Sequence, residues 1–289
     1  MRRSPVRAAL FALFLFVSAP FAGQPARENV FRFSILGDRT GGAMPGVYEQ
    51  VWRELDGLKP DFVINVGDTI EGGSDAAAPR EWSALRAIWD RYSYPRFFTP
   101  GNHDVWSAAS RRLYEEQTGH PLSYSFDFES AHFTVLDNSG GPMLSAGQMS
   151  FLEDDLRHNR GRAPKFVFFH EPFWIVWLKL GSGEFPLHQI AREYGVSYVV
   201  SGHGHQLVHV ERDGIHYVEA GSSGASISRG ASRGQGYDQG WFPQHLFVTV
   251  NGRMVAVSVR EIGRPFGKGR VTRLEDWDGN RLKQMPPAR

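Results

Sequence analysis

Short apolar segments that end directly in polar residues recur along this sequence, and they constrain its fold more than any other feature. Five such segments end in small clusters of Asp, Asn or His, which are Gly37-Asp38, Gly67-Asp68, Gly101-Asn102-His103-Asp104, His170 and Gly202-His203-Gly204-His205. Glycine lets the backbone turn sharply at the end of a strand. In α/β proteins, the loops beyond the carboxyl ends of strands gather at one edge of a sheet, where ligands bind. We therefore expect residues far apart in the sequence to converge on one site.

Helical patterns separate these segments. Val47, Val51, Leu55 and Leu58 have the spacing of one helix face, and Ser145 with Gln148 predicts a capping box for a helix that runs to about residue 159. Further helices are expected over 79–92 and 186–194, and strands over 31–35, 61–66, 96–99, 123–128, 132–136, 165–169, 196–200, 206–210, 216–219, 246–250 and 254–259. This order of elements predicts an α/β protein with a layered sheet sandwich flanked by helices.

The beginning of the chain has the layout of a secretory signal peptide. Arg2, Arg3 and Arg7 precede an apolar run over 8–17, and small residues follow up to Gly23. We expect a signal peptide over 1–22, with the mature chain beginning between about Pro20 and Glu28, and a periplasmic or secreted protein without a membrane span after cleavage. An uncleaved membrane anchor is the alternative, but the apolar run is short against the roughly 20 residues that a span needs.

Composition narrows the remaining possibilities. The 289 residues contain no cysteine, so disulfides, thiolate ligands and cysteine nucleophiles are excluded. One large domain over 28–263 accounts for most of the chain, and the polar, basic tail over 264–289 is expected to fray. The formal net charge of +1 gives no signature of nucleic-acid binding. The oligomeric state cannot be read from the sequence. The Gly- and Ser-rich stretch 221–240 predicts a mobile loop.

The polar clusters offer metal ligands. Carboxylate oxygens and imidazole nitrogens suit Mn, Fe or Zn. A single catalytic ion keeps one coordination position open and needs fewer than six protein donors. Two ions about 3.5–4 Å apart, bridged by one carboxylate, would use all six. The six candidate donors are Asp38, Asp68, Asn102, His170, His203 and His205.

The order GD…GD…GNHD…H…GHGH over about residues 31–210 resembles the calcineurin-like metallophosphoesterases, a superfamily that includes the purple acid phosphatases. The resemblance implies a four-layer β-sandwich of two mixed sheets flanked by helices. It also implies hydrolysis of a small-molecule phosphomonoester or phosphodiester with a metal-activated water. Asp68 would bridge the two ions, Asp38 and His205 would hold the first ion, and Asn102, His170 and His203 would hold the second.

The same resemblance implies roles around the ions. His103 would face the substrate and protonate the leaving oxygen, and Asp104 would hydrogen-bond His103 and favour its charged form. Arg39 directly follows Asp38, and its guanidinium suits bidentate contact with phosphate. We therefore take Arg39 as a residue that orients substrate, against the alternative of a structural ion pair.

The chain departs from the family pattern at the first motif. Most members have Asp-x-His there, whereas this chain has Asp38-Arg39-Thr40. The purple acid branch instead uses a Tyr three residues after the bridging Asp, a position that Glu71 occupies here. Glu71 or Thr40 could complete the first metal site. A non-catalytic binding or scaffold protein with a weakened metal site is the alternative function. Aromatic residues near the ligands, Trp106 among them, could form a rim for a nucleoside or aryl group or could be core.

Overall fold

The computed structural model describes residues 30–181, 185–227, 236–263 and 267–283. The predicted signal peptide lies outside these residues. Within them, no helix is long and apolar enough to cross a membrane. The elements are β1 Val30–Leu36, α1 Val47–Leu58, β2 Phe62–Asn65, α2 Ala78–Trp89, β3 Arg96–Phe97, α3 Ala108–Thr118, β4 Tyr124–Phe128, β5 Ala131–Val135, α4 Ala146–His158, β6 Lys165–Phe168, α5 Trp174–Leu180, α6 Pro186–Glu193, β7 Tyr198–Ser201, β8 Leu207–Arg212, β9 Ile215–Ala220, β10 Gln244–Asn251, β11 Met254–Gly263, β12 Gly267–Arg273, β13 Trp277–Asp278 and β14 Arg281–Leu282.

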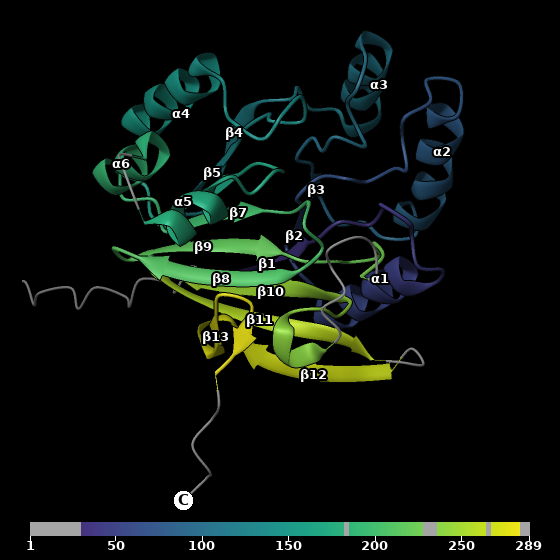
Figure 1. Ribbon diagram of the computed structural model, residues 1–289. Coiled ribbons are helices and arrows are strands. Elements are labelled where there is room, and N and C mark those ends of the chain that lie inside the picture. Colours follow the sequence, from purple (N-terminus) through teal and green to yellow (C-terminus); the bar gives the residue numbers. More distant parts are fainter. Residues whose placement is uncertain (1–29, 182–184, 228–235, 264–266, 284–289) are drawn as a thin grey trace, which may run out of the picture.

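Two six-stranded mixed sheets form the centre of the molecule (Figure 1). The first has the order β12-β11-β10-β1-β2-β3, with β1, β2 and β3 parallel and the other pairs antiparallel. The second has the order β4-β5-β6-β7-β9-β8, and its four central strands are parallel. The strand-helix alternation in the sequence produces these parallel pairs, because a parallel neighbour requires a crossover connection.

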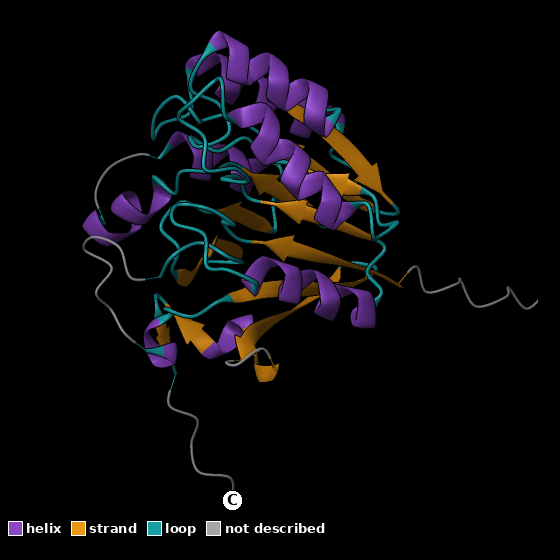
Figure 2. Ribbon diagram, turned by 90° about the vertical axis from the view of Figure 1, so that its right-hand side faces the viewer, coloured by secondary structure: helices purple, strands orange, loops and turns teal. Residues whose placement is uncertain are grey.

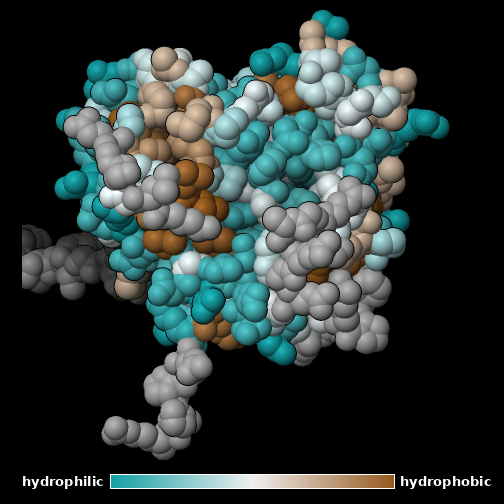
Figure 3. Space-filling view, in the orientation of Figure 1, coloured by the Kyte–Doolittle hydropathy of each residue, from teal (hydrophilic) through white to brown (hydrophobic). Residues whose placement is uncertain are grey.

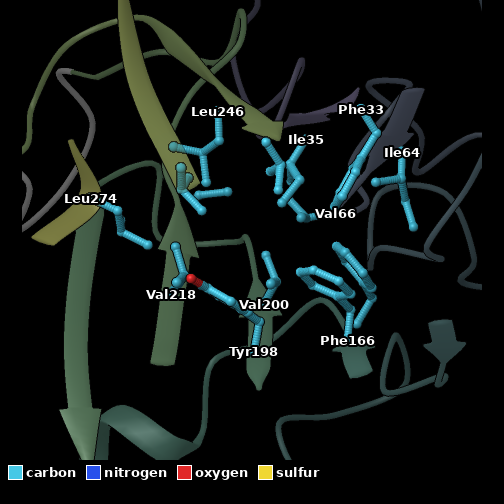
Figure 4. Packing of buried hydrophobic residues seen from close by; sticks show 14 of the residues in the cluster. Phe33, Ile35, Ile64, Val66, Phe166, Tyr198, Val200, Val218, Leu246 and Leu274 are labelled. Carbon is cyan, nitrogen blue, oxygen red and sulfur yellow. The ribbon is translucent and has the colours of Figure 1, made fainter. Parts of the chain in front are cut away.

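The main core lies between the two sheets. Figure 4 shows Phe33 and Ile64 of the first sheet facing Phe166 and Val200 of the second. The rings of Phe33 and Phe166 meet edge to face with centroids 5.3 Å apart, a favoured aromatic geometry. Burial of this apolar face on both sheets holds them together.

Helices cover the outer faces of both sheets, as Figure 2 shows from the side. Helices α1, α2 and α3 pack on the first sheet around Val51, Trp82 and Tyr114. Helices α4, α5 and α6 pack on the second sheet around Leu152, Trp174 and Leu187. The arrangement confirms the predicted four-layer α/β sandwich.

Three local features differ from the expectations of the sequence analysis. The Ser145 hydroxyl accepts a hydrogen bond from the Gln148 backbone N–H, but the Gln148 side chain accepts from Ser123 and from the Asp137 backbone N–H, so only half of the capping box forms. Helix α3 was not expected, because few of its residues are apolar. Helix α5 was not expected either, because the sequence indicated only aromatic residues there.

The prediction of a frayed tail is also wrong for the described part of the tail, residues 267–283. Strand β12 pairs with β11 and extends the first sheet, and β13 pairs with β14 as a small hairpin. Leu274 and Trp277 are buried in the core between the sheets. These two apolar anchors outweigh the basic character of the surrounding sequence, since a buried Trp alone contributes a large apolar area.

Candidate metal centre

The five polar clusters follow five different strands. Asp38, Asp68 and the 101–104 cluster come after β1, β2 and β3 of the first sheet, and His170 and the 202–205 cluster come after β6 and β7 of the second. The structure brings their side chains together in two groups, in which the potential ligand atoms lie within 4.8 Å of one another. The groups are Asp38 with Asp68 and His205, and Asp68 with His170 and His203. Asp68 belongs to both, which is the arrangement that a bridging carboxylate requires.

The second group also contains Asn102. The Asn102 Oδ1 atom lies 3.1 Å from His170 Nε2 and 2.9 Å from His203 Nδ1. His170 Nε2 lies 3.2 Å from Asp68 Oδ1. The other ring nitrogen of His170, Nδ1, lies 2.8 Å from the Val66 carbonyl oxygen. That contact assigns the Nδ1 proton to the carbonyl and leaves Nε2 for a metal ion, as in most protein metal sites.

The first group is built in the same way around Asp38. His205 Nε2 lies 3.4 Å from Asp38 Oδ2, and His205 Nδ1 lies 2.8 Å from the Ser226 carbonyl oxygen. Asp38 is fully buried, and neither of its carboxylate oxygens has a hydrogen-bond partner among the described residues. A buried carboxylate without hydrogen bonds is costly unless it meets a cation. The residues present therefore fit a metal ion at this position.

The backbone of the site adopts strained conformations. Asp68, His203 and His205 have φ angles of 53°, 74° and 59°, in the left-handed region that non-glycine residues rarely occupy. A Cβ atom on Gly202 would lie 2.3 Å from Asp38 Oδ1, so only glycine fits between the two sheets there. Such strain tends to be retained at functional sites.

The charges of the site are arranged around a protonated His170. Burial lowers the pKa of His170, but the charge and hydrogen bond of Asp68 outweigh this and raise it to about 10, so a metal ion at Nε2 would replace that proton. Burial raises the pKa of Asp38 well above its ordinary value, and the charge of His170 offsets only part of this effect. Burial acts on Asp68 in the same direction, but the charge and hydrogen bond of His170 outweigh it and hold the pKa of Asp68 at about 2. Burial and the charge of His170 lower the pKa of His203 to about 4, and burial lowers the pKa of His205. Both imidazoles are therefore neutral near pH 7 and have lone pairs to offer.

Comparison with known protein families identifies the family of this chain. The family model for calcineurin-like phosphoesterases matches residues 31–207, which include all six donors. The chain belongs to the calcineurin-like phosphoesterase family. No curated protein sequence matches it.

Solved structures with the calcineurin-like fold are similar at low sequence identity. A purple acid phosphatase from yellow lupin has 15% identity and a TM-score of 0.65 over 86% of this chain, which spans 54% of that protein. GAP50, the anchor in the inner membrane complex of Plasmodium, has 16% identity and a TM-score of 0.62 over 84% of this chain and 88% of its own. A dimetal phosphatase from Danio rerio has 13% identity and a TM-score of 0.57, with 84% and 98% covered. At these identities the likeness shows a shared fold.

The expected hydrogen bond between Asp104 and His103 is not formed, which corrects the prediction from the family resemblance. Asp104 is fully buried, and its carboxylate accepts hydrogen bonds from the backbone N–H groups of Thr69, Ile70 and Gly101. His103 Nδ1 instead lies 2.5 Å from the Glu71 carbonyl oxygen. Asp104 thus fastens the loop after β2 to the loop after β3, and burial together with the charge of Asp68 raises its pKa to about 7.

Glu71 and Arg39 lie beside the first group but are not part of it. Both oxygens of the Glu71 carboxylate accept from the backbone N–H groups of Gly42 and Ala43, so this side chain orders the loop after Asp38. Arg39 is half-buried, and its Nη1 atom donates to the Thr69 carbonyl oxygen at 3.4 Å. Thr40 is fully buried in the same loop.

Sequence reasoning missed residues that position the ligands. Asn138 is buried, its Oδ1 atom accepts from the backbone N–H groups of His170 and Glu171, and its amide donates to the Glu171 carbonyl oxygen. Asn138 lies in a polar cluster that follows β5 by one residue, a strand-end position like that of the candidate ligands. The start of the expected mobile loop is also ordered, because the backbone N–H groups of Ser223 and Ala225 donate to the Asp38 carbonyl oxygen. Residues 228–235 of that loop lie outside the described residues.

The aromatic residues near the ligands divide between core and surface. Trp174 is fully buried and donates to the Ser201 hydroxyl, so it is core. Figure 3 shows an apolar area over α5 and β8, where Val176 is exposed. Trp106 is half-buried and lines a cavity next to Asn102.

Proposed function

We propose that this chain is an exported, two-metal phosphoesterase that hydrolyses a small phosphate monoester or diester. The observation that carries the proposal is the pair of donor groups that share Asp68. Asp38, Asp68 and His205 would hold one ion, and Asp68, Asn102, His170 and His203 would hold the other. When bound, two such ions supply an activated water and neutralise the phosphoryl oxygens. The donor set of oxygen and nitrogen without sulfur suits Mn, Fe or Zn.

His103 would act on the leaving group. Its backbone N–H donates to Asp68 Oδ1 at 2.9 Å, which places the residue at the edge of the centre. Because Nδ1 faces the Glu71 carbonyl oxygen, the proton on Nδ1 is held there and Nε2 is the ring atom left for the substrate. A protonated Nε2 would donate to the leaving oxygen as the P–O bond breaks. Arg39 would contact the phosphate from the loop after Asp38.

The first metal group lacks the histidine that most family members supply. Its described donors are two carboxylates and one imidazole, and Thr40 is buried where the family pattern places the missing ligand. A hydroxyl is a poorer ligand than imidazole for these ions. We therefore propose that the first ion is bound more weakly than the second.

Export is proposed from the sequence of residues 1–22. A basic start, an apolar run and small residues precede the domain. In an exported enzyme, the ester substrate would come from outside the cytoplasm.

Metal content and turnover test the proposal together. The chain is purified without chelator, metals per chain are measured, and mono-aryl and bis-aryl phosphates are assayed with added Mn, Fe or Zn. Wild type should carry about two ions and turn over an aryl ester. Asp68→Asn should lose turnover by more than about 100-fold, because even residues outside the ligand shell cost about 10- to 100-fold. His158→Ala is the matched control, since His158 is an exposed histidine on α4 whose Nδ1 atom lies 2.6 Å from the carbonyl oxygen of Asp154 in the same helix.

Other outcomes discriminate between the alternatives. One ion per chain with turnover would mean that Thr40 has weakened the first position beyond use. Absence of both metal and turnover under every addition would reject the enzyme and favour a scaffold on this fold.

A further inference from the structure

A cavity of about 470 Å³ opens directly beside the metal centre. One of its walls is Asn102, the proposed ligand of the second ion, and the others include Trp106, Arg111, Asp137 and Ser139. We call this the Trp106 pocket. Its volume falls in the range of about 300–1,000 Å³ that small-molecule sites occupy. Because it shares a wall with the centre, an ester held there can extend its organic group into this pocket.

Trp106 forms a fixed aromatic wall of the pocket. Its ring packs close to Gly72, where an added Cβ atom would lie 2.8 Å from Trp106 Cζ3. Its backbone N–H donates to the Ser110 hydroxyl, within the capping box that begins α3 at Ser107. The backbone of Trp106 is therefore fixed, and part of its ring packs against Gly72 and the core beneath α2 and α3. A rigid indole of this kind is a platform on which a planar ring can stack.

Another part of the lining, Arg111, Asp137 and Ser139, combines hydrogen-bond donors and acceptors. Arg111 Nη2 lies 3.7 Å from Asp137 Oδ2, which is a loose ion pair, and the Arg111 side chain is 53% exposed. Asp137 Oδ1 accepts from both the backbone N–H and the hydroxyl of Ser139. Asp137 is thus held in place with Oδ2 turned toward Arg111. Charges of both signs lie here, so the wall suits a neutral polar group with hydroxyls rather than a second anion.

We propose that the Trp106 pocket binds the nucleoside part of a nucleoside monophosphate, whose phosphate is held at the metal centre. The base stacks on Trp106, and ribose hydroxyls donate to Asp137 and accept from Arg111. Carboxylates commonly accept from ribose hydroxyls in this way, and base–aromatic stacking is tolerant of base identity. A linear alcohol would leave the indole uncovered, and an acyl chain would desolvate Arg111 and Asp137 without replacing their partners.

This inference rests on the proposed phosphoesterase activity and names its substrate class. In the reaction, the oxygen of water joins phosphorus and the P–O bond to the ribose oxygen breaks. One proton of the water ends on that ribose oxygen, and the products are a nucleoside and inorganic phosphate. His103 supplies the proton to the leaving oxygen and regains one from the attacking water.

Paired kinetics test the pocket. The substrates are adenosine monophosphate and glycerol phosphate, which share a phosphomonoester but differ in the ring. Trp106→Ala should lower kcat/KM for adenosine monophosphate by about tenfold or more, because stacking on an aromatic side chain has an effect of this size, and should leave kcat/KM for glycerol phosphate within about threefold. Trp106→Phe keeps an aromatic face and should recover most of the loss. Arg112→Ala, which changes an exposed side chain next to Arg111 on α3, should change neither value.

Binding of adenosine alone gives a readout that does not depend on turnover. Calorimetry should detect adenosine binding to the wild-type protein and a loss of binding in Trp106→Ala. If Trp106→Ala does not fold, Arg111→Ala takes its place, because that side chain is mostly exposed, and it should weaken adenosine binding severalfold. Equal losses of kcat/KM for both esters, or no adenosine binding by wild type, would overturn the nucleoside assignment while aryl ester turnover stands. No turnover of any ester would instead reject the proposed function.

Discussion

The Asp104 carboxylate fastens two loops of the metal centre, and its removal should destabilise the fold measurably. It accepts from the backbone N–H groups of Thr69 at 2.8 Å, Ile70 at 3.2 Å and Gly101 at 3.1 Å. In Asp104→Ala, these three donors lose their acceptor in a fully buried place. Each unsatisfied buried donor costs about 1–3 kcal/mol.

The lower end of that range applies for two reasons. Burial and the charge of Asp68 raise the pKa of Asp104 to about 7, so near pH 7 the acceptor is only partly ionised. A water molecule can also enter the space that the carboxyl group leaves. We expect Asp104→Ala to lose about 3 kcal/mol of unfolding free energy. Asp104→Asn should lose less unfolding free energy than Asp104→Ala, because its amide oxygen can still accept a hydrogen bond. Some loss remains, because its NH2 group cannot accept one.

Urea unfolding followed by circular dichroism measures this difference. The slope of the transition should stay unchanged, so that the shift in midpoint reports stability. Glu153→Ala on the exposed face of α4 is the control and should stay within about 0.5 kcal/mol of wild type. If Asp104→Ala unfolds like wild type yet loses turnover, the carboxylate does not hold the loops, and the pairing of Asp104 with His103 would have to be reconsidered.

Two further predictions concern the candidate metal centre and the face of the second sheet that packs on α4. Gly202→Ala should reduce bound metal and turnover by at least about tenfold, since its Cβ would collide with Asp38. Gly161→Ala, an exposed position where the added Cβ meets open space, should leave metal content and turnover unchanged. His132 lies 2.7 Å and 2.9 Å from two carboxylates, one of them Asp155, and although burial lowers its pKa, hydrogen bonds to both carboxylates outweigh this and raise it. The raised pKa of His132 stabilises the folded protein below the unfolded pKa near 6.5, and this stabilisation is lost as pH rises through the folded pKa. In urea unfolding, His132→Asn should therefore lower the free energy of unfolding by about 1 kcal/mol more at pH 6 than at pH 9. An equal loss at both pH values would contradict the ion pair.

The sequence predicted which polar side chains converge on one place, because strand ends carry a strong local pattern. A short apolar run followed by Gly and a carboxylate or imidazole defines both an element and its boundary, and parallel strands bring such boundaries to one edge. The six candidate donors could therefore be expected to lie together without knowing which strands pair.

The contacts around the ligands could not be predicted in the same way. Asp104 follows His103 in the sequence, but the turn after β3 directs its carboxylate to the loop after β2. Adjacency in a chain does not determine which way two side chains point. Asn138 also lies in a polar cluster after a strand, but that cluster does not begin with the glycine that opens four of the five candidate ligand clusters, so the pattern did not identify it.

The described part of the tail shows a second reason why the sequence did not predict the structure. Its basic residues dominate the local composition, whereas Leu274 and Trp277 determine where it packs. Two apolar residues in a polar segment are too few for a periodic pattern, and their burial depends on the space that β11 and β8 leave beside the core.

The origin of the donors has a mechanical consequence. Asp38, Asp68 and Asn102 come from one sheet, and His170, His203 and His205 come from the other, so each proposed ion position has ligands from both. Bound ions would then cross-link the two halves of the sandwich at their shared edge. Ligand binding to the folded state alone stabilises it by mass action. Separation of the sheets and release of metal would become one coupled event, and the rigidity of the whole domain would depend on the metal supply of the compartment in which it works.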